Sequence, residues 1–160
     1  MIDLLDYRRQ VNALYWHVRH ADDVISAWQQ FRKTRDALFR SHPESPLDPQ
    51  TKLHFDHLDY YDYDPSYRVT APVNRDVEPL VITYDLGSDG RFQCSRFGKV
   101  NFTLPTGDAI LNLYWINGYG GGLFLPFGDA TNRQTTYGGG RYLYDTIKGS
   151  DLWSNENGMT

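Results

Sequence analysis

The feature that most constrains this chain is a series of short segments, from about residue 58 onward, in which apolar and polar residues alternate. Segments such as LVITYD, RFQCSRF and AILNLYWIN are separated by turn sequences such as GSDG and TGD. A period of two is typical of β-strands with one buried face, and short Asp/Gly turns join antiparallel neighbours. The pattern predicts an antiparallel meander and disfavours parallel βαβ units.

The N-terminal residues follow a different period. Apolar side chains recur there at three- and four-residue steps, which is the spacing of one helix face, at Leu4, Tyr7, Val11, Leu14 and Val18. This spacing predicts a first helix with one apolar stripe.

A second helix is indicated directly afterwards. Asp22 and Asp23 supply N-cap chemistry, and Pro43 ends the helix. Its apolar stripe is formed by Val24, Trp28, Phe31 and Leu38.

These patterns together predict an α+β fold, with two N-terminal helices packed on a curved antiparallel meander sheet or partly open β-barrel. A chain of 160 residues is the size of one domain. We therefore expect a single α+β domain over residues 1–152, helical over 1–42 and antiparallel β over 58–146. Residues 153–160 have little pattern, and we expect a loose C-terminal tail there.

Composition excludes several classes of partner. The net charge is −4, with 20 acidic and 16 basic residues, so the basic surface that binds nucleic acid or an anionic membrane is not expected. No apolar segment approaches the length of about 20 residues that spans a bilayer, and the N-terminus lacks a secretory pattern. We expect a cytoplasmic protein, and we expect its single cysteine, Cys94, to be a buried structural thiol.

No metal or cofactor is expected either. His17 and His20 share a helix spacing that can hold a metal, but such pairs are common on ordinary helix surfaces. The two YGGG segments, at 119–122 and 137–140, are followed by strand-like sequences. A phosphate-binding glycine loop instead precedes a helix whose N-terminal amides face the anion.

The strongest candidate for a site is the polar stretch GDATNRQTTYGGGRYL at residues 128–143. An arginine at the mouth of a sheet can grip a carboxylate or phosphate group. The first interpretation is therefore a site for a small polar or anionic molecule at the glycine-rich end of the sheet. The residues expected to line it are Asp129, Thr131, Thr136, Tyr137 and Arg141, with Arg68 as a second cation.

Three other interpretations remain open. In a purely structural one, Asp129 forms an Asx turn with Thr131, Arg141 pairs with Asp129 or Asp145, and the YGGG segments are turns that lead into two adjacent strands. In the third interpretation, the protein is a hydrolase that uses Asp129 as acid or base and Arg141 as electrostatic stabiliser. The histidines that the helices would then have to supply are His17, His20 or His42.

The fourth interpretation is a protein-interaction module without a small-molecule site. Its contact surface would be the LFLPF segment, where a flat apolar patch would form around Phe124 and Phe127, together with an exposed sheet edge.

Three blocks of the sequence resemble, in order, a bacterial and archaeal family called domain of unknown function 1684. They are WQQFRKTRDALFRSHPESPL, DYYDYDPSYRV and LYWINGYGGGLFLPFGDATNRQTTYGGGRYLYDTIKGSDL, and the likeness runs from about Trp28 to Leu152. The resemblance implies a β-rich domain preceded by helices, and it brings no activity, cofactor or catalytic residue.

The resemblance also implies a difference at the C-terminus. Members of that family continue past the DTIKGSDL-like segment into an apolar strand and a closing region rich in Pro, Cys and Asn, whereas this chain ends in a polar tail at Thr160. If that strand completes the sheet, its absence leaves an edge open, and open edges pair with other chains. We therefore expect a homodimer through an open sheet edge.

Overall fold

The structure, a computed structural model, describes residues 1–85, 87, 90–155 and 158–160. The chain divides into two compact units. One comprises Met1–Asp64 and Lys148–Leu152, and the other comprises Pro65–Ile147 and Trp153–Thr160. Each unit is described by itself.

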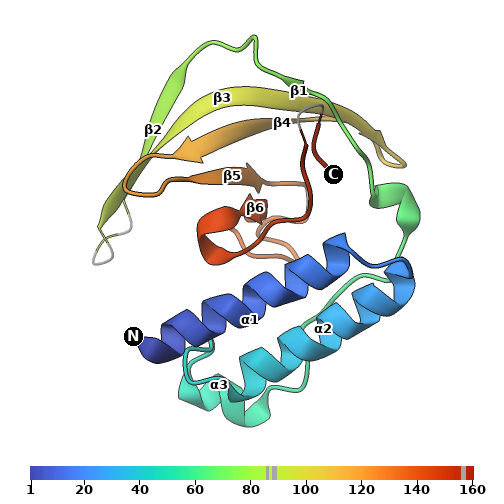
Figure 1. The fold of residues 1–160 in the computed structure, drawn as a ribbon, viewed down its shortest axis with the longest axis vertical. Coiled ribbons are helices and arrows are strands. Elements are labelled where there is room, and N and C mark those ends of the chain that lie inside the picture. Colours follow the sequence, from blue (N-terminus) through green and yellow to red (C-terminus); the bar gives the residue numbers. More distant parts are fainter. Residues whose placement is uncertain (86, 88–89, 156–157) are drawn as a thin grey trace. The chain divides into compact units, whose positions relative to one another are not determined.

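The first unit is helical. Helix α1 spans Ile2–Arg19 and helix α2 spans Val24–Ser41, and the two lie side by side (Figure 1). Asp23 is the N-cap of α2, as predicted, because its carboxylate accepts hydrogen bonds from the backbone N–H groups of Ile25 and Ser26. In the predicted stripe of α1, Leu14 is buried, but Leu4 is exposed.

Helix α2 ends where the sequence predicts. His42 has an extended backbone, with φ −68° and ψ 138°, because the ring of the following Pro43 disfavours the helical conformation at the residue before it. A third helix, α3 at Pro49–His54, was not predicted. Its signal is the pair Asp48–Pro49, in which Asp48 caps the helix and proline occupies the first turn.

The segment DYYDYD at residues 59–64 was expected to be a strand, and that expectation is wrong. The backbone N–H of Leu58, just before it, donates to the carboxylate of Asp36 on α2 (3.0 Å), and the guanidinium of Arg32 lies over the ring of Tyr60 at 5.0 Å. The Tyr63 ring also contacts Trp28 of α2. Side-chain contacts with a helix therefore replace the backbone ladder that the alternation suggested.

Residues Lys148–Leu152 belong to the helical unit although their neighbours on both sides belong to the other. Arg19 of α1 forms an ion pair with Asp151 at 3.4 Å and also donates to its backbone oxygen. Gly149 has φ +86°, and a Cβ atom there would lie 3.0 Å from the side-chain oxygen of Asn12. Glycine is therefore required where this segment approaches α1.

The second unit is a curved antiparallel sheet (Figure 1). Its strands run in the order β1-β3-β4-β5-β6, with β2 paired to β3, and they do not close into a barrel. Their bounds are Val73–Asn74 (β1), Leu80–Asp85 (β2), Arg91–Leu104 (β3), Gly107–Ile116 (β4), Gly122–Phe127 (β5) and Arg141–Asp145 (β6). The predicted α+β class, with two long N-terminal helices and an open antiparallel sheet, is confirmed. Of the predicted turn GSDG, Ser88 and Asp89 lie outside the described residues.

Gly98 directly follows the predicted strand segment RFQCSRF, but it does not end that strand, because β3 continues through it to Leu104. The pairing of β3 with β4 shifts between Arg96 and Gly98, which marks a β-bulge. A Cβ atom at Gly98 would lie 3.0 Å from a methyl carbon of Val73 and 3.1 Å from the backbone oxygen of Asn74. The glycine therefore lets β1 approach β3. A sequence pattern does not distinguish a glycine with this role from a glycine in a turn.

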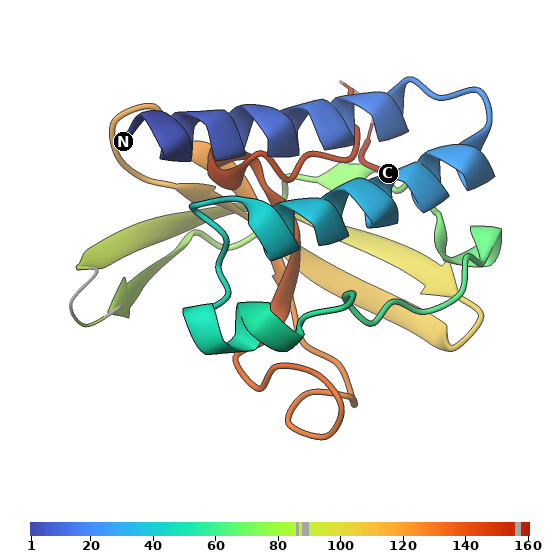
Figure 2. The same ribbon diagram turned by 90° about the horizontal axis from the view of Figure 1, so that it is seen from below.

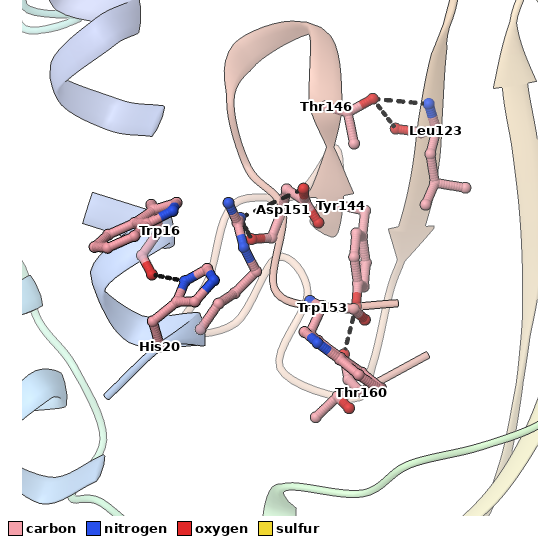
Figure 3. Close-up of polar contacts among 9 residues, drawn as sticks. Trp16, His20, Leu123, Tyr144, Thr146, Asp151, Trp153 and Thr160 are labelled. Atoms are coloured by element: carbon pink, nitrogen blue, oxygen red, sulfur yellow. Dashed lines mark hydrogen bonds and ion pairs between the residues drawn. The ribbon is translucent and has the colours of Figure 1, made fainter. Parts of the chain in front are cut away.

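The core of the sheet unit includes Cys94 and Leu113, both fully buried. Cys94 carries a free thiol that is buried in this core, as predicted. Burial raises the pKa of this thiol. Tyr144 is 1 % exposed, and its hydroxyl lies 2.6 Å from an oxygen of Thr160 and accepts a hydrogen bond from the N–H of Trp153 (Figure 3). The described residues of the expected loose tail are thus hydrogen bonded within this unit.

Candidate functional site

The loop between β5 and β6, residues 128–140, contains most of the predicted site and extends beyond the strands (Figure 2). Asp129 organises its first half. One oxygen of its carboxylate accepts hydrogen bonds from the backbone N–H of Thr131 (2.9 Å) and from the Thr131 hydroxyl, and the Asp129 N–H donates to the side chain of Asn132. This is the Asx turn of the structural interpretation.

Arg141, at the start of β6, closes the same cluster. One terminal nitrogen of its guanidinium donates to the second carboxylate oxygen of Asp129 at 2.5 Å and to the Thr131 hydroxyl at 3.2 Å. The guanidinium also lies over the ring of Phe127, 4.7 Å from its centroid. The buried Nε of Arg141 has no hydrogen-bond partner among the described residues. The cation predicted to grip a ligand therefore binds a carboxylate of its own chain.

These contacts also set the protonation state of Asp129. Hydrogen bonds from the Thr131 hydroxyl and backbone, together with the Arg141 guanidinium, hold the pKa of this carboxyl below its ordinary value. A general acid or base at neutral pH needs a carboxyl pKa that is raised toward 7. The pKa of Asp129 is displaced in the opposite direction, so its carboxyl stays ionised at neutral pH.

The rest of the loop is held by its own backbone. The N–H groups of Gln134, Thr135 and Thr136 all donate to the Thr131 carbonyl, and the hydroxyls of Thr131 and Thr136 lie 2.9 Å apart. Gly140 has φ +87°, and a Cβ atom there would lie 2.9 Å from the Phe127 carbonyl oxygen. Gly140, the last glycine of the second YGGG segment, thus serves the turn itself.

The remaining predicted residues, Tyr137 and Arg68, form no hydrogen bond or ion pair with this cluster in the described part of the chain. Tyr137 is 77 % exposed, and Arg68 is exposed in the segment that follows the short 3₁₀ helix Pro65–Tyr67. The structure therefore brings together Asp129, Thr131, Thr136 and Arg141.

The two YGGG segments lie at opposite ends of the β5–β6 pair. The first leads into β5 and the second into β6, and these strands are antiparallel neighbours. The sheet accordingly has two glycine-rich ends, which the spacing of the motifs in sequence does not reveal.

A hollow of about 630 Å³ lies at the end where β4 leads into the first YGGG segment. Its lining comes from β2, from β3 and from the turn after β4: Thr83, Arg91, Phe92, Gln93, Asn117 and Gly118. Pairing of Thr83 with Gln93 across β2 and β3, and a hydrogen bond from the Asn117 N–H to the Gln93 carbonyl (2.7 Å), bring these elements together.

The hollow has a partly polar lining, and its one charged lining residue, Arg91, is paired with a carboxylate. The Nε of Arg91 donates to the carboxylate of Asp85 at 2.8 Å. The amide nitrogen of Gln93 donates to the Thr83 hydroxyl at 3.3 Å. The Asn117 amide exchanges hydrogen bonds with the hydroxyl of Ser95, at 2.9 and 3.2 Å. Amide and hydroxyl groups therefore share this surface with the apolar Phe92, and the surface carries little net charge.

Sequence reasoning missed this hollow, although a signal was present. Thr83 and Asp85 of β2 and Arg91 and Gln93 of β3 are the polar members of two alternating strands. Only the register of the hairpin places Thr83 opposite Gln93, and only the β4 connection adds Asn117. No motif in the sequence encodes that set.

A second hollow, of about 260 Å³, lies in the helical unit beside His42. The backbone N–H of Glu44 donates to Nδ1 of His42, which assigns the proton to Nε2, and Nε2 lies 3.3 Å from the carboxylate of Asp6. Hydrogen bonds from Gln10 and His42 lower the pKa of Asp6. Both ring nitrogens of His42 thus have partners, and neither is available as a catalytic base in this arrangement.

Two further findings concern the described residues as a whole. No helix among them combines the length and apolarity needed to cross a membrane. Within the same ranges, no three or more His, Cys, Asp or Glu side chains are grouped so that they could hold a metal ion.

The comparisons with known proteins agree with this architecture. The chain belongs to the family described as "Protein of unknown function (DUF1684)", whose model matches residues 53–157. The resemblance of the sequence to that family is thereby confirmed. No curated protein matches the chain.

A solved relative shares the fold. It is the uncharacterized protein from gene locus rrnAC0354 of Haloarcula marismortui, determined by solution NMR, with 31 % sequence identity and a TM-score of 0.53. The match covers 76 % of this chain and 66 % of that protein. Neither comparison assigns an activity.

Proposed function

We propose that this protein binds a small, uncharged polar molecule in the hollow lined by Thr83, Gln93 and Asn117. The observation that carries the proposal is a hollow of about 630 Å³ whose amide and hydroxyl groups converge from three elements. Small-molecule sites fall in this range of volume and fix their ligands with a few such groups. The proposal keeps the predicted small polar ligand but moves its site from the loop at residues 128–140 to the opposite end of the β5–β6 pair, at the first YGGG segment.

An uncharged ligand is favoured over an anionic one because the arginines at the two glycine-rich ends of the sheet, Arg91 and Arg141, have carboxylate partners. Arg91 binds Asp85 at 2.8 Å and Arg141 binds Asp129 at 2.5 Å. An anion would have to compete with these carboxylates. Trp115, 47 % exposed and paired with Ser95, adds a flat aromatic surface on the same face as Gln93. Amides, hydroxyls and an aromatic face together suit a polyol or a primary amide.

The test is an NMR titration of the amide signals with defined probes. The neutral probes are glycerol, acetamide and D-glucose, and the anionic probes are acetate and inorganic phosphate. We expect a neutral probe to give saturable shifts at Gln93, Asn117 and Gly118. Gln93→Leu should abolish those shifts, because it removes the amide but keeps the size of the side chain.

Asn101→Leu is the matched control, since it removes an exposed amide from the same strand outside the hollow. Saturable shifts that occur only with anions and only at Asp129–Arg141 would instead support the site predicted from sequence. Absence of a saturable shift with every neutral probe would contradict the proposal.

A second proposal concerns the partner. We infer that the protein self-associates through an edge of its sheet, because the described strands do not close into a barrel and edge strands carry unpaired backbone groups. The apolar patch expected around Phe124 and Phe127 gives this inference no support. Phe124 is half-buried against Tyr84 and Tyr142, and Phe127 lies under the Arg141 guanidinium.

A further inference from the structure

One stretch of β4 has an edge without a strand beside it. β3 pairs with β4 from Gly107 to Ile116, but β5 pairs only with Tyr114–Ile116. On that side of the sheet, the seven residues Gly107–Leu113 have no β-partner in the part of the chain that the structure describes.

The direction of the backbone groups follows from the neighbouring strands. The N–H of Leu123 in β5 donates to the Thr146 hydroxyl, on the side away from β4, and the N–H of Asn117 donates toward β3. Backbone groups alternate in direction along an antiparallel strand. Asp108, Ile110 and Asn112 therefore present their N–H and C=O groups to the open side.

This edge lacks the features that usually prevent pairing. Natural edges carry lysine, proline or a bulge. The stretch from Gly107 to Leu113 contains no lysine or proline, pairs in regular register with β3, and has Asp108 as its one charge. Ile110, at its centre, is 66 % exposed.

We propose that Gly107–Leu113 pairs antiparallel with the same stretch of a second copy, with Ile110 on the two-fold axis. This inference rests on the proposed self-association and names its edge. Pairing requires that opposite residues both face outward, and the centre at Ile110 is the register that pairs all three outward-facing residues, Asp108, Ile110 and Asn112. It places Asp108 opposite Asn112 of the second copy, so the carboxylate faces an amide donor and not another carboxylate.

The test is the mass of the protein in solution, measured by sedimentation and native mass spectrometry over a dilution series. We expect a dimer for the unaltered protein and a monomer for Ile110→Lys, because two ammonium groups would then face each other across the axis. Val81→Lys is the matched control: Val81 is 58 % exposed on the edge strand β2. We expect this variant to remain dimeric.

Hydrogen exchange of the unaltered protein tests the register without a substitution. The amides of Ile110 and Asn112 should gain protection as protein concentration rises, and the amides of β2 should not. A monomer at every concentration would overturn the self-association itself. A dimer that survives Ile110→Lys but not Val81→Lys would overturn only the assignment to β4.

Discussion

At the scale of single residues, the polar groups that looked most like a site bind each other. Asp129, Thr131, Thr136 and Arg141 form one cluster that fixes the loop between β5 and β6. The geometry gives each of them a structural role, whereas Thr83, Gln93 and Asn117 surround a hollow. Thr83, Gln93 and Asn117 also have hydrogen-bond partners within the chain, so the feature that makes them candidate ligand groups is the hollow beside them.

The protonation of Asp129 gives a pH prediction. Its pKa in the folded protein lies below the ordinary 3.8, so the ionised carboxylate stabilises the loop at and above that pH. This stabilisation is lost as the pH falls through the folded-state pKa. We expect the Asp129 carboxyl carbon to titrate, by NMR, below the ordinary aspartate value of 3.8. A midpoint near 6 or 7 would revive its role as an acid or base.

Replacement of Arg141 separates loop structure from ligand binding. Arg141→Ala removes the guanidinium that joins Asp129, Thr131 and the Phe127 ring. We expect faster hydrogen exchange at the amides of residues 131–136, and unchanged probe shifts at Gln93. Arg133→Ala, which removes a cation from the same loop, is the control. Loss of the Gln93 shifts in Arg141→Ala would link the loop to the hollow.

At the scale of elements, a glycine is required where the backbones of two strands approach closely. Gly98 lies at the bulge of β3, where an added Cβ atom would meet Val73 and Asn74 of β1. We expect Gly98→Ala to destabilise the protein by about 1–3 kcal/mol, because the added methyl group must displace Val73 or the backbone of Asn74. Asn101→Ala, at an exposed position of the same strand, provides the reference. Chemical denaturation measures both, and equal stabilities would show that β1 moves without cost.

At the scale of the whole molecule, the chain passes between the two units three times, after Asp64, Ile147 and Leu152. Neither unit is one continuous segment, so we propose, as the sequence suggests, that they unfold as a single domain. Leu113→Ala in the fully buried core of the sheet should then cost about 2–5 kcal/mol. It should lower the melting temperature of the helical amides as much as that of the sheet.

Residue-resolved NMR melting measures this directly. Leu38→Ala, in the helical unit, is the reciprocal variant, since Leu38 is also buried. A helical unit that melts at its original temperature in Leu113→Ala would show two independent domains.

The sequence by itself determined the class of fold. Helix stripes and alternating strands are local patterns, and capping by Asp23 and termination at Pro43 are local chemistry, so each can be derived from neighbouring residues. The same local reasoning derived the Asx turn at Asp129, because the residues involved lie within a few positions of each other.

Only the tertiary structure decided which polar groups share a surface. DYYDYD alternates like a strand, yet it binds α2, because Asp36 accepts the backbone N–H that precedes it and Arg32 lies over Tyr60. Thr83, Gln93 and Asn117 meet because of a hairpin register and a turn. Contacts between distant segments depend on how whole elements pair. The sequence carries the local pattern of each element, but it does not specify which polar groups the pairing brings together.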